Sequence, residues 1–541
     1  MFRHTCQLQS PFLLITLPWL NPFFLSPSPA MVSMLFSWAC VAILIGVYRP
    51  EPLGVRMRWH WTNATATAWL VAALLSSLLG LLQYFGDTAI FGQWISSASV
   101  GTSFANLRQR NQFATLTNIG LAALLWWVAQ GRVALALPQW RKNVGHVKPG
   151  LWALSGCAGA WMPLTAALLL AIGNAASSSR TGLLQLLVLI GMAGGWSLRG
   201  RVGEGRANAQ KRQVWHVLLV VALAYAVAAM ALPGLAGLDS DASGILARLH
   251  AGDSQCSSRL TLWSNVLHLI AQKPWLGWGW GELDYAHFIT LYSGPRFCDI
   301  LANAHNLPLH LAVELGVPFA LLFCVVGIWI VLRAKPWRET DATRQMAWTV
   351  LTLIGLHSLL EYPLWYGPFQ MAVGLSIYLL WRTPAAIGNG APSSGSPPSE
   401  TETETGIALH RGLTPLARRF IAVAAAFFIA VLAYVAWDYH RISQIYLPPD
   451  SRAAAYRDNT LAKVQGSRLF KNQVRFAELT TTPLSQGNAL HTFELARDLL
   501  HFSPEARVVE KLIESAVLLG RDDEAQFYQA RFNAAFPQVQ R

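Results

Sequence analysis

Long apolar segments recur along most of this chain, and they constrain its fold more than any other feature. A membrane span needs roughly 20 predominantly apolar residues. Eleven candidate segments run approximately 12–25, 31–48, 64–84, 112–128, 151–173, 181–198, 214–231, 306–332, 345–360, 369–381 and 417–437. The first and the tenth are short enough to be re-entrant or tilted. Since only 13% of the residues are charged, against roughly 25% in a soluble domain, we predict an all-α polytopic membrane protein with about 11 transmembrane helices.

Basic residues mark every second connection between these segments. Lys and Arg are enriched in short cytoplasmic loops, and the connections after the second, fourth, sixth and eighth segments are basic. This parity predicts a bacterial inner-membrane protein in which segment 232–304 and the end of the chain face the periplasm. The net charge of +13 is explained by the same loops. No nucleic-acid-binding module is visible, so we expect no nucleic-acid partner.

The composition changes after the tenth segment. Residues 383–416 include NGAPSSGSPPSETETETG, which is typical of a flexible linker. The last span, 417–437, is followed by a polar region, 438–541, whose end has apolar residues at helical spacing. We expect a helical pair there, similar to one tetratricopeptide unit, with Ser503 capping its first helix. The chain is thus divided into a transmembrane bundle (1–382, including loop 232–304), a cytoplasmic linker, the last span and a periplasmic helical domain.

Two cysteines, Cys256 and Cys298, share the long periplasmic loop. The periplasm is oxidising, so we expect a disulfide between them. No C-x-x-C spacing and no paired carboxylates typical of a metal site occur in the periplasmic loops. We therefore expect neither a metal nor another cofactor.

Ionisable residues at a membrane face are candidates for function. Arg180 follows three serines in SSSRTG, at the start of the sixth segment, where a helix N-terminus and a guanidinium favour an anion. Arg259 begins an amphipathic helix, SRLTLW. His305, in AHNLPLH, lies at the periplasmic start of the eighth segment, where it either accepts a proton or only caps the helix.

Two weaker motifs lie at the same predicted depth. The QRNQFA motif contains Gln109, Arg110 and Asn111 at the start of the fourth segment. Its arginine either snorkels to lipid headgroups or contributes with its neighbours to a polar pocket. Tyr362 follows the ninth segment, beside Glu361. Two arginines, a histidine and a tyrosine at one level favour a phosphate-bearing lipid substrate and a hydroxyl acceptor.

The order of these motifs resembles the superfamily of O-antigen ligases and bacterial O-linked oligosaccharyltransferases, which also includes O-antigen polymerases. QRNQFA, SSSRTG, SRLTLW…PWLGWGWG and AHNLPLHLAVELG surround one long periplasmic loop in the expected order. LPWLNPFF, HSLLEYPLWY and the C-terminal extension are similar to the pilin-type branch, which glycosylates proteins.

The resemblance implies that a preassembled glycan is transferred en bloc from undecaprenyl pyrophosphate to Ser or Thr hydroxyls of pilin-like or other periplasmic proteins. Arg180 and Arg259 would then bind the pyrophosphate, His305 would be catalytic, and Gln109, Arg110, Asn111 and Tyr362 would support the site. Transfer to the lipid A core is the nearest alternative, and polymerisation of the glycan is the third. A lipid-glycan transporter is disfavoured, because its ionisable residues would lie near the midplane of paired repeats.

Overall fold

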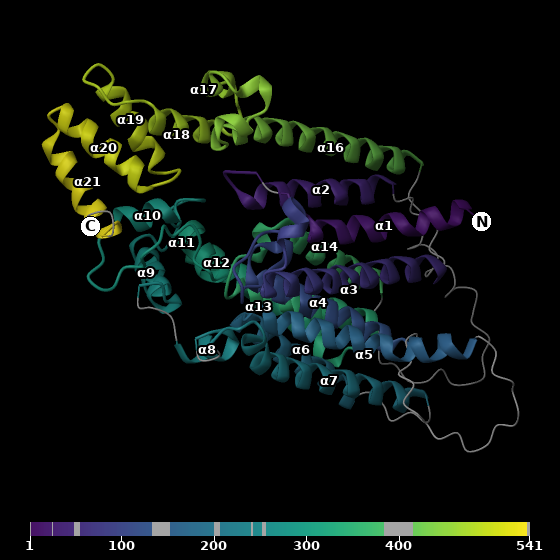
Figure 1. Cartoon of the computed structure of the whole chain (residues 1–541). Helices are drawn as coiled ribbons and strands as arrows, with labels where there is room; N and C mark the ends of the chain where they lie inside the picture. The colour runs from purple at the N-terminus through teal and green to yellow at the C-terminus, as the bar shows by residue number, and fades with distance from the viewer. Residues whose placement is uncertain are drawn as a thin grey trace, which may run out of the picture.

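The computed structural model describes residues 2–23, 25–47, 55–131, 152–199, 206–239, 242–251, 256–383 and 415–537. Within these ranges the chain is helical and forms no strand, so the predicted all-α class is confirmed. Eight helices lie side by side in a bundle and share one apolar core (Figure 1). They are α1 (Phe2–Leu20), α3 (Val55–Phe85), α4 (Arg110–Ala129), α5 (Trp152–Ala176), α6 (Arg180–Arg199), α7 (Arg206–Leu235), α13 (Ala342–Ser358) and α14 (Gly367–Arg382).

α2 (Pro29–Val47) adds Leu44 to the same core, and two further apolar helices accompany the bundle, α12 (Val317–Ala334) and α16 (Pro415–Ser443). Among the described residues, six helices are long and apolar enough to cross a membrane. They are Trp61–Phe85, Arg110–Ala129, Arg180–Arg199, Asn208–Leu235, Val317–Arg338 and Arg419–Tyr446. Each of the eleven predicted segments overlaps a helix, so the chain is a multi-pass membrane protein, whereas the count of eleven spans stays a prediction. The predicted linker, apart from its ends, lies outside the described residues.

The prediction of one continuous span over 306–332 was wrong. The chain forms a short helix, α11 (Leu307–Leu315), and then begins α12 after a break at Gly316. Gly316 has a φ of +90°, a conformation that residues with a Cβ rarely adopt. An added Cβ would also lie 2.1 Å from the carbonyl oxygen of Trp275. The membrane-spanning helix therefore starts at Val317, eleven residues later than predicted, and α11 is a separate element.

The backbone groups freed by this break are satisfied by the loop that precedes α11. The amide of Val317 donates to the carbonyl of Pro274 (2.8 Å), and the amide of Trp278 donates to the carbonyl of Val313 (2.8 Å). Buried backbone groups left without such partners would destabilise the fold. The PWLGWG segment is therefore a structural clasp around the break, and it holds the loop against α11.

The predicted loop 232–304 contains three helices, α8 (Gly244–Ala251), α9 (Arg259–Gln272) and α10 (Leu283–Ile289). Leu262, Val266 and Ile270 lie on the buried face of α9, as their spacing predicted. This face packs on α10 and α11. The structure joins Cys256 to Cys298 in a disulfide, with their Cα atoms 5.2 Å apart. A closed loop of this length stabilises the fold by about 4 kcal/mol in the chain-entropy model.

The C-terminal region forms small helices, the first of which packs beside α16, while the others share a core with α10 of the loop. They are α17 (Thr460–Val464), α18 (Lys471–Thr481), α19 (Ala489–Leu499), α20 (Ala506–Leu518) and α21 (Asp522–Ala535). Phe288 of α10 belongs to their core, and His501 stacks on Tyr285. The last two helices lie where a helical pair was expected. Ser503 does not cap α20, because Glu505 occupies the N-cap position and accepts a hydrogen bond from the Ser503 hydroxyl.

Candidate functional site

The starts of α4, α6, α9 and α11 meet around one carboxylate, Glu361, in the turn after α13. Arg259 of α9 donates to its Oε1 (2.8 Å), and the side-chain amide of Asn111 donates to the same oxygen (3.1 Å). Nδ1 of His305 lies 2.9 Å from Oε2. Three segments that are far apart in the sequence are thereby joined at a single side chain.

The Glu361 carboxyl is held in its ionised form. Its side chain is only 9% exposed, and this burial by itself would raise the pKa. The hydrogen bonds from His305 and Arg259, together with the charge of Arg259, outweigh burial and lower the pKa of Glu361 below its ordinary value. A buried carboxylate with cationic partners is stable as the anion, so Glu361 can orient and polarise its neighbours at neutral pH.

His305 is positioned by its backbone as well as by Glu361. It has a left-handed φ of +49°, and its amide donates to Oδ1 of Asn303 (2.8 Å). The next residue, Asn306, caps α11 and also donates to the carbonyl of Leu359 (3.1 Å), at the end of α13. Since Nδ1 faces the carboxylate, the tautomer that carries its proton on Nδ1 would leave Nε2 as a hydrogen-bond acceptor.

Tyr362 packs edge-on against the imidazole of His305, with ring centroids 5.1 Å apart. Burial is the main reason that the pKa of this phenol is raised above its ordinary value. The side chain therefore remains protonated and acts as a hydrogen-bond donor rather than a base. Its position beside the histidine agrees with the expected supporting role.

Arg259 is fixed at its position by the turn before it. Ser258 caps α9 by accepting from the amide of Thr261 (3.1 Å), and the disulfide at Cys256 anchors the chain three residues earlier. The side chain of Arg259 is 29% exposed. One of its terminal nitrogens binds Glu361, so only part of the guanidinium faces away from the carboxylate.

Arg180 is the first residue of α6 and is half-buried. Two of the three preceding serines use their hydroxyls within the protein. The Ser177 hydroxyl donates to the carbonyl of Asn174 (2.6 Å), and the Ser179 hydroxyl donates to Oδ1 of Asn111 (2.6 Å). Ser179 also accepts from the amide of Gly182 (2.9 Å). These hydroxyls shape the turn and connect it to Asn111, whereas the guanidinium of Arg180 is the cationic group at this helix start.

The QRNQFA residues divide between structure and site. Gln109 caps α4, because its side-chain oxygen accepts from the amide of Gln112 (3.0 Å). Asn111 bridges Ser179 to Glu361 and belongs to the site. Arg110 begins α4 and is half-buried. Its neighbour Arg108 donates to the carbonyl of Pro22 (3.1 Å), which ties the connection to the end of α1.

Glu361 is the residue that sequence reasoning did not select, although it was noted beside Tyr362. Its signal was a lone carboxylate at the end of an apolar segment, at the level of the histidine and the arginines. The other histidines of this region are structural. His357 is fully buried with Nδ1 2.9 Å from the Thr115 hydroxyl, and His310 is buried beside Glu314.

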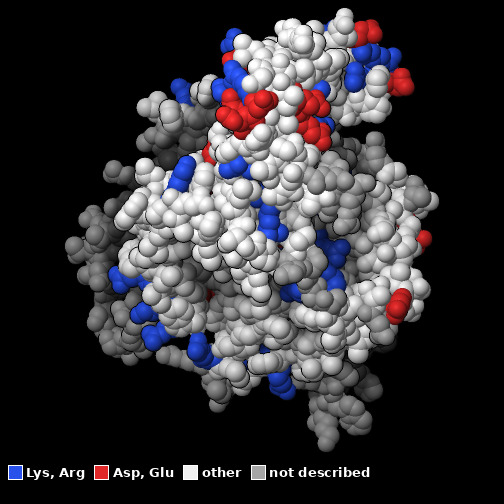
Figure 2. Space-filling model, turned by 90° about the vertical axis from the view of Figure 1, so that its left-hand side faces the viewer, with Lys and Arg blue, Asp and Glu red and all other residues white. Residues whose placement is uncertain are grey.

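The surface at this end of the molecule shows where charges gather. In Figure 2, acidic side chains cluster with basic ones over the C-terminal helices at the top, whereas the face below carries mostly Lys and Arg. Clefts with one sign of charge attract ligands of the other sign. The described residues contain no group of three or more His, Cys, Asp and Glu arranged to hold a metal ion.

Three protein-family models match parts of the chain. A model described as protein glycosylation ligase matches residues 104–128, and one described as O-antigen ligase matches 165–324. One described as virulence factor membrane-bound polymerase, C-terminal, matches 345–541. The first two matches include Asn111, Arg180, Arg259 and His305, and the third includes Glu361.

Two curated proteins of Acinetobacter baylyi are similar to segments of the chain. The protein named general O-oligosaccharyltransferase is 30% identical over 154 residues, which are 28% of this chain and 26% of that protein. The protein named ComP-specific O-oligosaccharyltransferase is 26% identical over 118 residues, 22% of this chain and 21% of the relative. The matches span about a quarter of these relatives. Together with the family models, they confirm the resemblance of this chain to the superfamily of O-antigen ligases and bacterial O-oligosaccharyltransferases.

Proposed function

We propose that this protein transfers a preassembled glycan en bloc from undecaprenyl pyrophosphate to Ser or Thr hydroxyls of pilin-like or other periplasmic proteins. The observation that carries the proposal is the cluster in which Glu361 binds Arg259 and faces Nδ1 of His305. An oriented histidine and a cationic group for a leaving diphosphate are the two components that such a transfer requires.

In the proposed reaction, Nε2 of His305 accepts the proton of the acceptor hydroxyl. The hydroxyl oxygen forms a bond to the anomeric carbon of the glycan, while the bond from that carbon to the pyrophosphate oxygen breaks. Undecaprenyl pyrophosphate leaves with the bonding electron pair. The imidazolium that forms is stabilised by Glu361, 2.9 Å from Nδ1, because a carboxylate at one ring nitrogen increases the basicity of the other.

The leaving diphosphate gains negative charge as the bond breaks. We assign its binding to Arg180 at the N-terminus of α6 and to the face of Arg259 that does not contact Glu361. Helix N-termini and guanidinium groups both stabilise phosphate oxygens. Since these fixed charges supply the stabilisation, the reaction is proposed to need no metal, and transfer should persist in the presence of EDTA.

The proposed location is the bacterial inner membrane with the site facing the periplasm. The alternating basic connections of the sequence support it, and within the described residues the site lies at the end of α13 opposite the basic connection that precedes this helix. A reporter fused after Arg201 should report cytoplasm, and one after Ser254 or at the C-terminus should report periplasm. A cytoplasmic C-terminus would overturn this topology.

Transfer of the glycan to the lipid A core is the alternative, since residues 165–324 match the O-antigen ligase model. The C-terminal helices packed on α10 favour a protein acceptor, because they add a surface to the loop that carries Arg259, which a lipid acceptor does not require. The test is a deletion strain, complemented with the wild-type gene or with His305→Ala. Loss of periplasmic glycopeptides with normal lipopolysaccharide supports the proposal, and the reverse pattern overturns it.

A further inference from the structure

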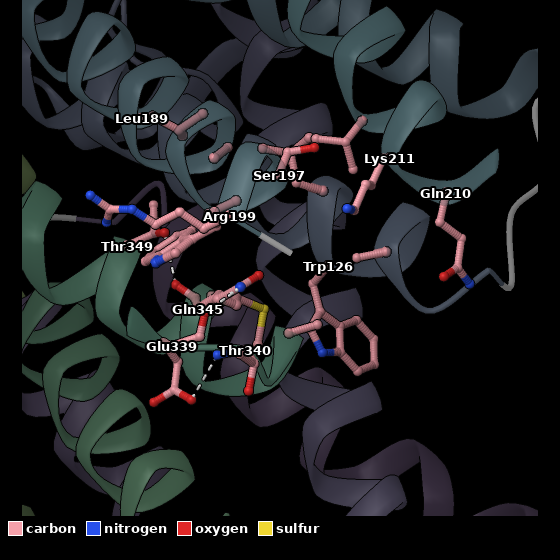
Figure 3. Close-up of a pocket in the computed structure, with 18 of the residues that line it drawn as sticks. Trp126, Leu189, Ser197, Arg199, Gln210, Lys211, Glu339, Thr340, Gln345 and Thr349 are labelled. Atoms are coloured by element: carbon pink, nitrogen blue, oxygen red, sulfur yellow. Dashed lines mark hydrogen bonds between the residues drawn. The ribbon is translucent and has the colours of Figure 1, made fainter. Parts of the chain in front are cut away.

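A second recess lies at the other end of the helices that carry the site. It has a volume of about 520 Å³ and is lined by the last turns of α4 and α6, the start of α7, the short helix η3 (Pro336–Arg338) and the first turns of α13. Figure 3 shows side chains around it, with Glu339 and Gln345 on the side opposite Leu189 and Ser197. Glu361 lies beyond the far end of α13, so this recess is separate from the site.

The inner wall of the recess is apolar and its aromatic side chains are fixed. Leu125, Leu189 and Met346 line it together with several alanines. Two tryptophans of the lining use their indole N–H within the protein. Trp126 donates to the Thr343 hydroxyl (3.1 Å) and Trp196 donates to the carbonyl of Pro336 (2.9 Å). The walls are thus held in place without a ligand and offer an apolar surface.

The polar part of the lining is basic. Arg199, Lys211 and Arg338 line the recess, and its one acidic residue is Glu339. The Glu339 carboxylate is neutralised by Arg344, which lies outside the lining. Within the described part of the chain, Arg338 makes no side-chain hydrogen bond or ion pair, and Arg199 binds only the carbonyl of Trp337 (2.8 Å). Among the described residues, Arg199 and Arg338 thus have no acidic partner, and the recess combines their positive charge with an apolar wall.

We propose that this recess binds an anionic phospholipid of the adjacent leaflet, with its phosphate on Arg199, Lys211 and Arg338 and the beginning of an acyl chain along the apolar wall. Basic pockets between membrane helices on the cytoplasmic side are suited to anionic headgroups. A water-soluble phosphate would leave the apolar wall unused. A zwitterionic lipid would bring its cationic group among the arginines.

The lipid would contact the same three helices that position the site. α4 carries Asn111 at its other end, α6 carries Arg180, and α13 leads into Glu361. A ligand that binds only the folded state stabilises it by mass action. Occupancy of the recess would therefore stabilise the packing of the helices that hold the site, without touching the reacting groups.

The test measures lipid binding and does not depend on transfer. The full-length detergent-solubilised protein is incubated with equal amounts of phosphatidylglycerol and phosphatidylcholine, and the retained lipids are quantified by native mass spectrometry. The wild type should retain phosphatidylglycerol preferentially. Arg199→Gln and Arg338→Gln should each reduce its retention about five-fold, since each basic group near a membrane surface contributes a factor of that size.

Two further variants keep the test specific. Arg333→Gln removes an exposed basic residue at the end of α12 that does not line the recess, and it should retain phosphatidylglycerol as the wild type does. Ala193→Phe fills the apolar wall and should reduce retention while Arg199 and Arg338 remain. Equal retention of both lipids, or equal losses in Arg333→Gln and Arg338→Gln, would overturn the proposal. Displacement of the lipid by inorganic phosphate alone, or preference for a polyisoprenyl phosphate, would also overturn the assignment to a phospholipid.

Discussion

Two carboxylates at opposite ends of α13 are each bound by an arginine, yet their surroundings differ. Glu339, before α13, pairs with Arg344, and both side chains are at most 10% exposed. Arg344 also donates to the carbonyls of Leu380 and Thr383 (2.8 and 2.7 Å). Glu361, after α13, pairs with Arg259 and faces His305, whose side chains are about one-third exposed.

This difference separates an ion pair that stabilises the fold from one that serves chemistry. The guanidinium of Arg344 that binds Glu339 also donates to backbone carbonyls at the end of α14. The groups around Glu361 come from distant segments and leave part of a guanidinium and one imidazole nitrogen accessible. Accessibility of the partners, rather than the presence of an ion pair, is therefore the feature that identifies the site.

The largest expected effect concerns His305, which lies beside Glu361 and has no counterpart among the described partners of Glu339. His305→Ala should lower glycan transfer by about 10³-fold, the range expected for loss of a general base, while donor binding is retained. Transfer is measured in vitro with purified acceptor, and donor binding is measured separately.

The matched control is His268→Ala, an exposed histidine on α9. It should transfer at the wild-type rate. His310 and His357 are unsuitable controls, because both are buried and their loss would disturb packing. Substantial turnover by His305→Ala, or failure only through lost donor binding, would refute its role as a base.

Exchange of Glu361 for glutamine should mainly lower the transfer rate, whereas exchange of Glu339 for glutamine should mainly lower the stability of the fold. Glu361→Gln should lower transfer by about 10²-fold and should destabilise the fold less than Glu339→Gln does, because the partners of Glu361 are partly solvated. Glu339→Gln should destabilise the fold by about 3 kcal/mol, since it leaves Arg344 buried without its counter-charge. Transfer rate and thermal unfolding are measured on both variants. Equal stability losses would remove the distinction drawn between the two ends.

The accessible arginines should be sensitive to the shape of the cation. Arg180→Lys and Arg259→Lys keep the charge but lose the planar fork that binds two phosphate oxygens. Each should lower transfer by about tenfold at normal expression. Arg333→Lys at the end of α12 should have no effect. Near-normal transfer by both site variants would exclude bidentate binding of the diphosphate.

The smallest expected effect is on the pH dependence of stability. The pKa of Glu361 is lowered in the folded protein, so its ionisation stabilises the fold at neutral pH. This contribution is present above the unfolded value of about 4.3 and is lost as the pH falls through the folded pKa. The unfolding temperatures of the wild type and Glu361→Gln should converge between pH 6 and pH 3. A gap that is constant over this range would contradict the assignment.

The helical class and the positions of most apolar segments could be predicted from the sequence, because length and hydropathy determine them locally. The break at Gly316 could not. A glycine between Leu315 and Val317 is compatible with a continuous helix, and the interruption depends on the loop at Trp275 and Trp278, which is brought there by tertiary contacts.

The members of the candidate site that lie in recognisable motifs could be predicted from the sequence. Arg259 and His305 were selected from their spacing and depth, and the structure brings both to Glu361. Glu361 was not selected, since one carboxylate in a polar turn has no distinctive pattern. The internal use of Ser177, Ser179 and Gln109 was also invisible, because a capping hydroxyl or amide and a ligand-binding one have the same sequence signature.

The clasp around the break has a consequence for genetics. An added Cβ at Gly277 would lie 2.4 Å from the carbonyl oxygen of Glu314, and one at Gly316 would meet Trp275 as closely. The close backbone contacts at these glycines fix the position of α9, which begins with Arg259, relative to α11, which follows His305. A random screen for loss of glycosylation should therefore recover bulky substitutions at Gly277 and Gly316 as alleles that insert and accumulate normally yet are inactive, although neither residue belongs to the site.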